Sequence, residues 1–302
     1  MKHLFIVNPV AGKGYALRRI AEIKEYFETG GKAGEEEYEI RVTEYPGHAT
    51  EIAREYSSAQ NLRIYSVGGD GTLNETLNGM AGSGSILGVI PSGSGNDFIR
   101  SIAGDNIPEN IIRHTVEGKE KPVDYARIND KYFINIASLG FDAEVAYQTN
   151  HFKKLPLISG SMAYVLGILS TISICKNHHM ELRTDNGVLS GKTLLVAVGI
   201  GKYYGGGVLA LPDAEVDDGL FDICYVEAKP RLDILRLFTK YMKGLHREIE
   251  GVHLIRSKSV EIIPDEPIPL NRDGEIVMAD KAVFEIFPKG IPFIVPSVPR
   301  QP

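Results

Sequence analysis

The sequence has no tryptophan, only two cysteines and no long block of lysine and arginine. Cys175 and Cys224 show neither metal-site spacing nor a disulfide framework, which fits a reducing compartment. The formal net charge of −6 argues against sequence-independent nucleic-acid binding, which needs many cations on phosphates. The first apolar run, residues 4–7, is shorter than the core of a signal peptide. We therefore expect a cytoplasmic protein without a nucleic-acid partner.

The segment nearest to a membrane span is found at residues 155–174. It has about the length that crosses a bilayer, but Pro156, two glycines and several hydroxyl residues make it a poor span. We interpret it as a lipid-contacting or buried amphipathic segment, with plain core packing as the alternative. His151, Lys153 and Lys154 precede it and are candidates for contacts with anionic headgroups.

The chain is long and apolar enough, with 302 residues of which 43% are hydrophobic, for a sizeable core and two domains. In the first 120 residues, strand-like runs alternate with helical patterns. The runs start at residues 4, 38, 62 and 86. Repeated βα units predict a parallel sheet with helices on both faces, and ligands of such sheets bind beyond the carboxyl ends of the strands.

From about Lys121 the pattern changes to consecutive β-like runs, with a hairpin signal at Asn186-Gly187. The second part is therefore predicted to be an antiparallel β-sandwich or barrel. Helical insertions are expected at residues 155–174 and 231–245. The predicted fold class is thus α/β plus β, with an α/β domain over residues 1–122 and a β-sandwich domain over residues 123–287. The proline-rich residues 288–302 could pack back on the first domain.

Glycine-rich turns follow three of the predicted strands. The first, at residues 8–14, is not a Walker loop, because Lys13 is followed by Gly14 and not by serine or threonine. A plain βα turn explains it as well as phosphate binding does. The third, at residues 91–100, offers a hydroxyl donor, helix-capping side chains and an arginine that can hold a carboxylate. Simple termination of a strand explains those residues equally well.

The second turn reads Gly68-Gly69-Asp70-Gly71-Thr72 and is followed by Asn74 and Glu75. Three glycines around an acid are costly to order, and close approach of backbone N–H groups to phosphate explains them best. Asp70 could orient a metal, a water or a substrate hydroxyl, whereas Thr72 could cap a helix or donate to a phosphate. We interpret this turn as a nucleotide-phosphate loop.

Acidic residues also occur in two turns of the second part. The turn at residues 212–220 could be an Asx-rich turn or an oxygen-ligand cation site. In Arg272-Asp273-Gly274-Glu275 two carboxylates lie one residue apart, and both would point to one face if the backbone were extended. Such a pair is a candidate general base with a supporting neighbour, and a solvated hairpin turn is the alternative.

Taken together, the order and spacing of these motifs resemble the bacterial soluble diacylglycerol kinase-like lipid kinases over nearly the whole chain. The GGDGT sequence alone is shared with the NAD kinase and phosphofructokinase groups. Its combination with Asp218-Gly219-Leu220 and Asp273-Gly274-Glu275 is more specific.

The resemblance implies an ATP- and Mg²⁺-dependent kinase that phosphorylates a lipid hydroxyl, with diacylglycerol as the expected substrate. The nucleotide would lie between the α/β domain and a β-sandwich domain that takes the lipid. The enzyme would contact the membrane surface transiently, and a homodimer stays open.

The same resemblance assigns roles to individual residues. Glu275 would be the catalytic base with Asp273 beside it, although the wider family also allows Asp70 or Asp273 as the base. The implied nucleotide contacts are Asn8, Thr43, Gly69, Asp70, Gly71, Thr72, Glu75 and Ser94, the last replacing a threonine that the family often has. The implied magnesium ligands are the Asp218 carboxylate and the backbone carbonyls of Glu215 and Leu220, with Asp70, Asp97 and Asp124 in a water-linked network.

Two other functions stay open from the sequence. An NAD kinase-like enzyme acting on a soluble nucleotide would share the glycine-rich acidic loop. A non-catalytic nucleotide-binding regulator would keep the glycines and lose the acids. Asp70, Asp218, Asp273 and Glu275 are all present, and this counts against the regulator.

Overall fold

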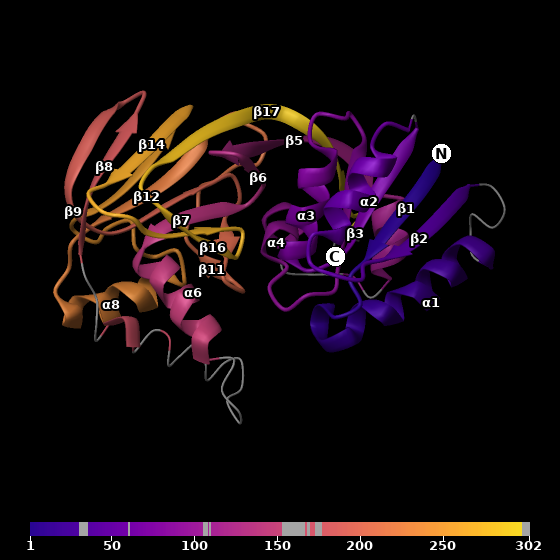
Figure 1. The fold of residues 1–302 in the computed structure, drawn as a ribbon, viewed down its shortest axis with the longest axis horizontal. Helices are drawn as coiled ribbons and strands as arrows, with labels where there is room; N and C mark the ends of the chain where they lie inside the picture. The colour runs from indigo at the N-terminus through magenta and orange to yellow at the C-terminus, as the bar shows by residue number, and fades with distance from the viewer. Residues whose placement is uncertain are drawn as a thin grey trace, which may run out of the picture.

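The computed structural model describes residues 1–29, 36–59, 61–104, 108, 110–152, 167, 170–172 and 177–297. The chain forms two lobes that lie side by side, with β5 (Lys119–Ile128) and β17 (Ala282–Val295) running between them (Figure 1). None of the helices among these residues combines the length and apolarity that a membrane span requires. The predicted lipid-contacting segment at 155–174, with Lys153 and Lys154 before it, lies almost wholly outside the described residues.

The N-terminal lobe contains a parallel sheet in the order β4-β3-β1-β2, with helices on both faces. In β1, Leu4 and Ile6 pack on the side of α2 and α3, while Phe5 and Val7 pack on the side of α1 and α5. All four side chains are fully buried, and each contributes roughly 1.5–3 kcal/mol of burial free energy. The elements of this lobe are β1 (Lys2–Val7), η1 (Ala11–Gly14), α1 (Tyr15–Glu28), β2 (Glu37–Val42), α2 (His48–Tyr56), β3 (Leu62–Gly68), α3 (Asp70–Met80), β4 (Ile86–Pro91), α4 (Asp97–Ala103) and α5 (Ile111–Val116).

The C-terminal lobe is built from antiparallel strands, with two helices at its lower edge in Figure 1. The α/β plus β fold class predicted from the sequence is thereby confirmed. The elements of this lobe are β6 (Lys131–Phe133), β7 (Ile136–Gly140), α6 (Phe141–Phe152), β8 (His178–Thr184), β9 (Gly187–Gly199), β10 (Tyr203–Tyr204), β11 (Val208–Leu209), β12 (Phe221–Glu227), α8 (Arg231–Tyr241), β13 (Val252–Ser257), β14 (Ser259–Pro264), β15 (Ile268–Arg272) and β16 (Glu275–Ala279).

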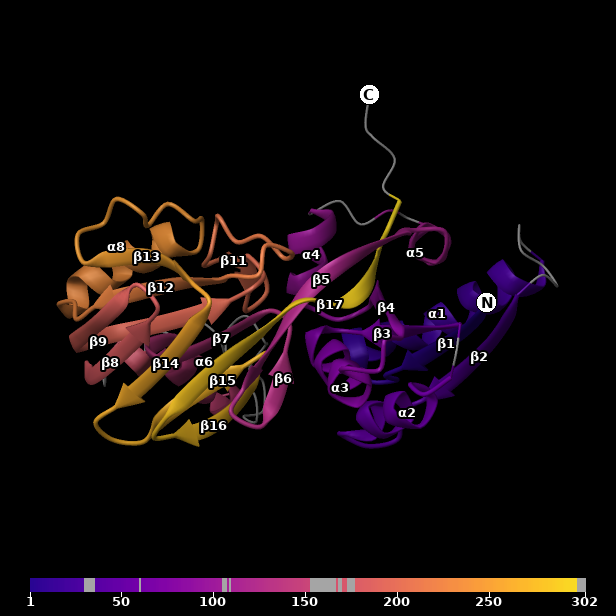
Figure 2. The same ribbon diagram turned by 90° about the horizontal axis from the view of Figure 1, so that it is seen from above.

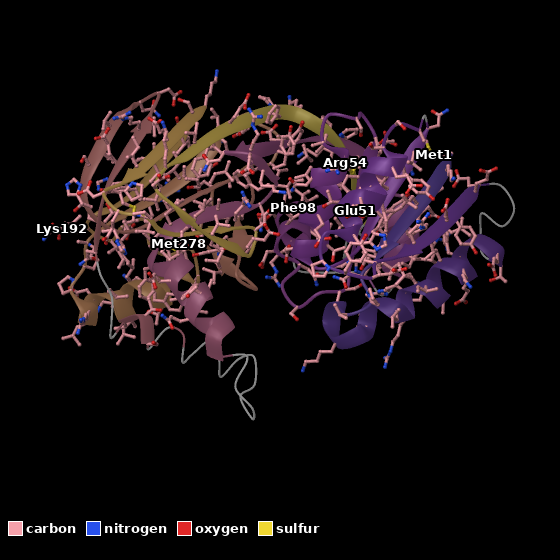
Figure 3. The ribbon with its side chains drawn as sticks, viewed as in Figure 1. Met1, Glu51, Arg54, Phe98, Lys192 and Met278 are labelled. Carbon is pink, nitrogen blue, oxygen red and sulfur yellow. The ribbon has the colours of Figure 1, made fainter. Side chains whose placement is uncertain are left out.

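The two lobes share one continuous sheet, because β17 pairs with strands of both. It runs antiparallel to β14 in the C-terminal lobe and parallel to β4 at Phe293, opposite Leu87 (Figure 2). Phe98 of α4 packs its ring edge-on against that of Phe293 with centroids 5.4 Å apart, on the side of the N-terminal lobe that faces the other lobe (Figure 3). The division of the chain at residues 122 and 287 stays a prediction, and β5 and β17 run through those positions.

Candidate active site

The three glycine-rich loops meet at the carboxyl end of the parallel sheet. The N–H groups of Ser92 and Gly93 donate to the Gly68 carbonyl at 2.8 and 3.1 Å. A Cβ atom on Gly12 would lie 2.2 Å from the Ser92 oxygen, and one on Gly93 would lie 2.4 Å from the Gly69 Cα. Side chains are excluded at these positions because the loops touch through their backbones. The result is a cradle whose surface is largely peptide groups, which suits phosphate oxygens.

Four of the predicted nucleotide residues lie on segments at this edge of the sheet. The Asn8 amide donates to Thr72 Oγ1 at 3.0 Å, which ties the first loop to α3. The Thr43 N–H donates to the Val7 carbonyl at 2.9 Å, so the end of β2 lies beside the end of β1. Thr72 lies inside α3 and is not its N-cap, which is Gly69. Ser94 is exposed in the third loop.

Helix α3 begins at the glycine-rich acidic loop and presents its first turn to the cradle. Gly71 is exposed there, and an added Cβ atom would meet no atom within 4 Å. A helix N-terminus has free N–H groups and a partial positive charge, both of which favour an anion. The open space at Gly71 is therefore the position where a phosphate would approach the helix.

Replacing Gly71 by alanine should raise the KM for ATP at least tenfold while leaving the melting temperature unchanged or higher. Alanine is about 1 kcal/mol better than glycine inside a helix, and its methyl group would occupy only the space left for phosphate. Gly79→Ala in the same helix should behave oppositely, because its Cβ would lie 2.4 Å from the Thr50 carbonyl. Thermal melts and ATP titrations of both variants check this, and an unchanged KM in Gly71→Ala would contradict it.

Glu75 points away from the loop toward helix α2. Its carboxylate accepts the N–H groups of Gly47 and Ala49 at 2.9 and 3.3 Å, and its carbonyl accepts the Thr50 hydroxyl at 2.8 Å. The side chain thus satisfies the free amides at the start of α2. The assignment of Glu75 as a nucleotide contact stays a prediction. The contacts that it makes in the structure hold the start of α2 against α3.

Asp70 and Asp97 form an acidic pair beneath the third loop. Asp70 Oδ1 accepts the Phe98 N–H at 3.2 Å, and a Cβ on Gly95 would lie 2.8 Å from Asp70 Oδ2 and 3.1 Å from Asp97 Oδ2. Burial raises the pKa of both carboxyl groups, and the charge of Asp70 raises the pKa of Asp97 further. Such desolvated acids close to a phosphate cradle are typical of functional sites.

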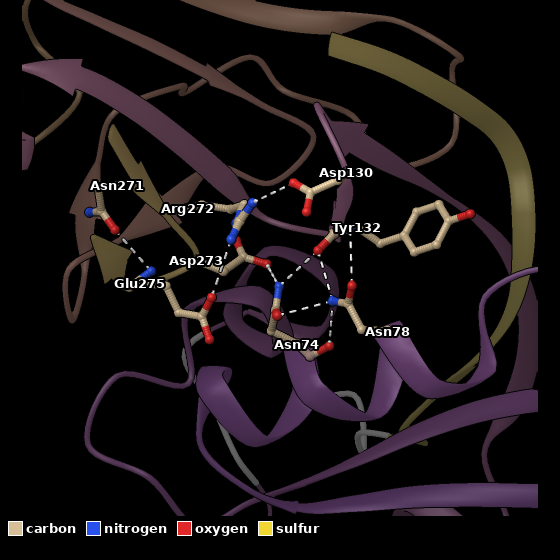
Figure 4. Close-up of polar contacts among 9 residues, drawn as sticks. Asn74, Asn78, Asp130, Tyr132, Asn271, Arg272, Asp273 and Glu275 are labelled. Atoms are coloured by element: carbon tan, nitrogen blue, oxygen red, sulfur yellow. Dashed lines mark hydrogen bonds and ion pairs between the residues drawn. The ribbon is translucent and has the colours of Figure 1, made fainter. Parts of the chain in front are cut away.

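The second lobe contributes Asp273, in the turn between β15 and β16 (Figure 4). Its Oδ2 accepts the Asn74 amide of α3 at 2.9 Å and the Ile134 N–H at 3.2 Å, and its Oδ1 accepts the Ile136 N–H at 3.2 Å. Burial raises its pKa to about 6, and the charge of Asp70 adds to this shift. Asp273 therefore joins the two lobes and belongs to the electrostatic neighbourhood of Asp70.

Glu275 follows Asp273 but has a different environment. Asp273 has a φ of +45° and is not extended, so the two carboxylates do not share a strand face as the extended interpretation supposed. Glu275 is exposed, and its carboxylate lies 3.4 Å from Arg272 (Figure 4). The sequence predicts that Asp70 lies close to Glu275, whereas the charge interaction that the structure records for Asp70 in this turn is with Asp273. The accessible carboxylate of the pair is that of Glu275.

Two residues of the predicted magnesium network, Asp218 and Asp124, have other partners in the structure. Asp218 pairs with the Arg256 guanidinium and accepts the Leu220 N–H at 3.0 Å. Asp124 accepts the N–H groups of Gly219 and Lys289 at 2.7 and 2.6 Å, and burial raises its pKa. It thus holds the acidic turn against β17.

In the structure the Asp218 carboxylate pairs with Arg256, which also lies 3.6 Å from Asp222, so a cation at this turn would have to displace the guanidinium from Asp218. Among the residues that the structure describes, no three His, Cys, Asp or Glu side chains are grouped to hold an ion. The assignments of Glu215, Leu220, Asp97 and Asp124 to a metal network stay predictions.

The glycine run at residues 205–207 of the second lobe is not among the residues predicted from the sequence, but it contacts the acidic pair. The Gly206 N–H donates to Asp97 Oδ2 at 2.8 Å. Arg100, which the sequence offers as one that can hold a carboxylate, lies 3.2 Å from Asp97 Oδ1, and its guanidinium lies 5.6 Å from the ring centre of Tyr203. Three consecutive glycines after two tyrosines were the available signal for this contact.

The glycine cradle with Asp70 and Asp97 on one lobe faces Asp273 and Glu275 on the other, an arrangement that fits a two-lobed kinase. The family model of the diacylglycerol kinase catalytic domain matches residues 2–128, and that of the YegS C-terminal NAD kinase beta sandwich-like domain matches residues 135–295. The chain belongs to the diacylglycerol kinase family of lipid kinases.

Individual relatives cover most of the chain. The diacylglycerol kinase of Bacillus subtilis (strain 168) is 31% identical over 278 residues, which are 89% of this chain and 88% of that protein. A Shewanella frigidimarina protein assigned as a YegS-like lipid kinase is 30% identical over 267 residues, 83% of this chain and 85% of that protein. A crystal structure from Bacillus anthracis str. Sterne, assigned to the diacylglycerol kinases, superposes with a TM-score of 0.75 at 26% identity and covers 97% of both chains.

Proposed function

We propose that this protein transfers the γ-phosphate of ATP to a lipid hydroxyl and that diacylglycerol is its substrate, giving phosphatidic acid. The observation that carries the proposal is the meeting of the glycine cradle with Asp273 across the lobe boundary, through Asn74. Phosphoryl transfer requires mainly alignment and charge stabilisation, and this geometry provides surfaces for both.

In the proposed reaction, the glycine cradle and the first turn of α3 hold the phosphates of ATP. The lipid hydroxyl oxygen attacks the γ-phosphorus as the bond to the bridging oxygen of ADP breaks, and the hydroxyl proton passes to a carboxylate. Glu275 takes this proton because its carboxylate is exposed, whereas that of Asp273 already accepts three hydrogen bonds. Asp273 holds the turn that positions Glu275.

A lipid acceptor is supported by a cavity of about 420 Å³ between α6 and the β15–β16 hairpin. Its lining combines apolar side chains, among them Phe141, Ile268 and Met278, with the polar Glu144, His178 and Glu266. Strand β16 carries both Met278 and Glu275. An acyl chain in this cavity would therefore lie on the lobe that carries the proposed base. Such an enzyme works at a membrane surface, and we propose a transient, peripheral contact by a cytoplasmic protein.

Transfer of labelled phosphate from ATP tests the proposal. Purified protein with ATP should label diacylglycerol in mixed micelles, and mass spectrometry of a total lipid extract should find phosphatidic acid as the main product. The match of the second lobe to an NAD kinase-like domain makes NAD the appropriate second acceptor. Labelling of NAD without any labelled lipid would replace the proposed function by the NAD kinase-like one.

A further inference from the structure

Helix α8 exposes apolar side chains that the fold of the lobe does not require. Its buried stripe, formed by Ile234, Leu237 and Tyr241, already packs on the strands. On the other side, Leu232 is 83% exposed and Leu235 is 46% exposed. In the turn that follows, Met242 and Leu245 are 42% and 63% exposed. These four side chains and the cations around them, between residues 229 and 247, are called the α8 surface below.

The α8 surface is also strongly cationic. Residues 229–247 contain six lysines and arginines and one aspartate, a formal net charge of +5 in a chain of net charge −6. Arg247 pairs with Asp213. Lys229 is half-buried and donates to the Glu250 carbonyl. Within the described ranges, no ion pair involves the remaining four cations, which are exposed: Arg231, Arg236, Lys240 and Lys243.

The two properties occur on the same exposed side of one helix. Leu235 and Met242 are seven residues apart, about two turns, and Leu232 precedes Leu235 by three, so these three side chains form one strip, with Leu245 in the turn that follows. Arg236 and Lys243 each follow a member of this strip by one residue, which places cations along its border. An exposed strip of leucine and methionine bordered by lysine and arginine is the pattern of a helix that lies in a bilayer interface.

We propose that the α8 surface docks this protein on an anionic phospholipid bilayer, with the apolar strip at the acyl boundary and the cations among the headgroups. A second copy of the chain is a poorer occupant, because a symmetric contact would bring two surfaces of charge +5 together. Figure 1 shows α8 and α6 together at one edge of the C-terminal lobe, and α6 packs against β15. The docked edge would therefore belong to the lobe that carries Glu275.

This inference rests on the proposed lipid kinase function, but its test needs no turnover. The probes are vesicles of phosphatidylcholine with 30% phosphatidylglycerol and vesicles of phosphatidylcholine alone. We expect the wild-type protein to sediment with the anionic vesicles, to be released by salt and to bind the zwitterionic vesicles much more weakly.

Two variants separate the contributions of charge and apolar contact. The triple variant Arg236→Gln, Lys240→Gln, Lys243→Gln and the double variant Leu232→Ser, Leu235→Ser should each bind the anionic vesicles at least tenfold more weakly. All five side chains are exposed, so both variants should keep the wild-type melting temperature.

The matched control changes the same number of charges on the other lobe. In Arg18→Gln, Lys24→Gln, Lys119→Gln, three exposed cations are removed and vesicle binding should stay within twofold of the wild type. Wild-type protein that ignores anionic vesicles, α8 variants that bind like the wild type, or an α8 variant that instead changes the oligomeric mass would each overturn the inference.

The failure of the proposed function has a different signature. In detergent micelles of short-chain diacylglycerol, the α8 variants should phosphorylate as fast as the wild type, and only their activity on anionic vesicles should fall. Absence of any lipid phosphorylation by the wild type in micelles would refute the proposed function and leave the vesicle-binding result standing by itself.

Discussion

Asp70→Asn should lower kcat for phosphate transfer by roughly 10³-fold, within the range found when a charged catalytic group is removed, and leave the fold intact. Asparagine has the same shape, and its oxygen can still accept the Phe98 N–H that Asp70 Oδ1 accepts at 3.2 Å. The change therefore removes the charge and one of the two acceptor oxygens that face the backbone N–H groups of the third loop. That charge acts on both Asp97 and Asp273, which places it between the two halves of the site.

The control is Asp130→Asn, which removes a carboxylate near the lobe boundary. Asp130 is 83% exposed and lies 3.8 Å from Arg272, so its loss should change kcat less than threefold. Single-turnover kinetics with saturating ATP and diacylglycerol in micelles, together with thermal melts, measure both effects. More than a tenth of wild-type kcat in a well-folded Asp70→Asn protein would contradict the central role of this residue.

The fold could be predicted because its signals are local and repeated. The continuous apolar run that contains Leu4 and Phe5 reads as a strand buried on both sides, and such strands followed by helices fix a parallel sheet. The glycine loops were predictable for a similar reason, since each follows a strand. The sequence could not show that Gly12 and Ser92 touch, because that contact depends on how two loops from distant strands pack.

The site was less predictable where a residue has more than one possible partner. Glu75 belongs to the loop motif, but the amides of Gly47 and Ala49 take its carboxylate, and their position depends on the packing of α2 against α3. Asp218 matches a metal-ligand pattern, yet Arg256 on β13, almost forty residues later, lies beside it. Which of several possible partners binds such a carboxylate depends on tertiary packing, and a local motif carries no information about that packing.

Asp273 shows how a local sequence pattern can locate a turn of the site but not the contacts of each side chain in it. The sequence predicts that Glu275 of this turn approaches Asp70, whereas the structure brings Asp273 to the nucleotide loop through its hydrogen bond with Asn74. The sequence leaves an extended strand and a hairpin turn open for these residues, and the left-handed φ of +45° in the β15–β16 hairpin decides for the turn. That conformation turns the Asp273 carboxylate into the lobe boundary and separates its environment from that of Glu275.

The different environments of these two carboxylates predict different kinetic signatures. Glu275→Gln should lower kcat by roughly 10³-fold with little change in the KM for ATP, because it removes the proposed proton acceptor but keeps the size of the side chain. The buried Arg272 loses Glu275 as an ion-pair partner in that variant but still has Asp130 at 3.8 Å. The turn should therefore stay folded. A Glu275→Gln protein with more than a tenth of wild-type kcat would transfer the role of base to another acid.

Asp273 should instead determine the acid limb of the pH profile. Its raised pKa of about 6 means that wild-type activity falls as the pH drops through 6, since protonation removes the charge that holds the Asn74, Ile134 and Ile136 donors. The same shift means that ionised Asp273 costs folding stability above about pH 6 and that this cost disappears toward the unfolded-state pKa near 4. Asp273→Asn, whose asparagine tolerates the left-handed backbone, should lose that limb between pH 5 and 7 and keep a lower, flat activity. An acid limb that survives in Asp273→Asn and vanishes in a partly active Glu275→Gln would exchange the two roles.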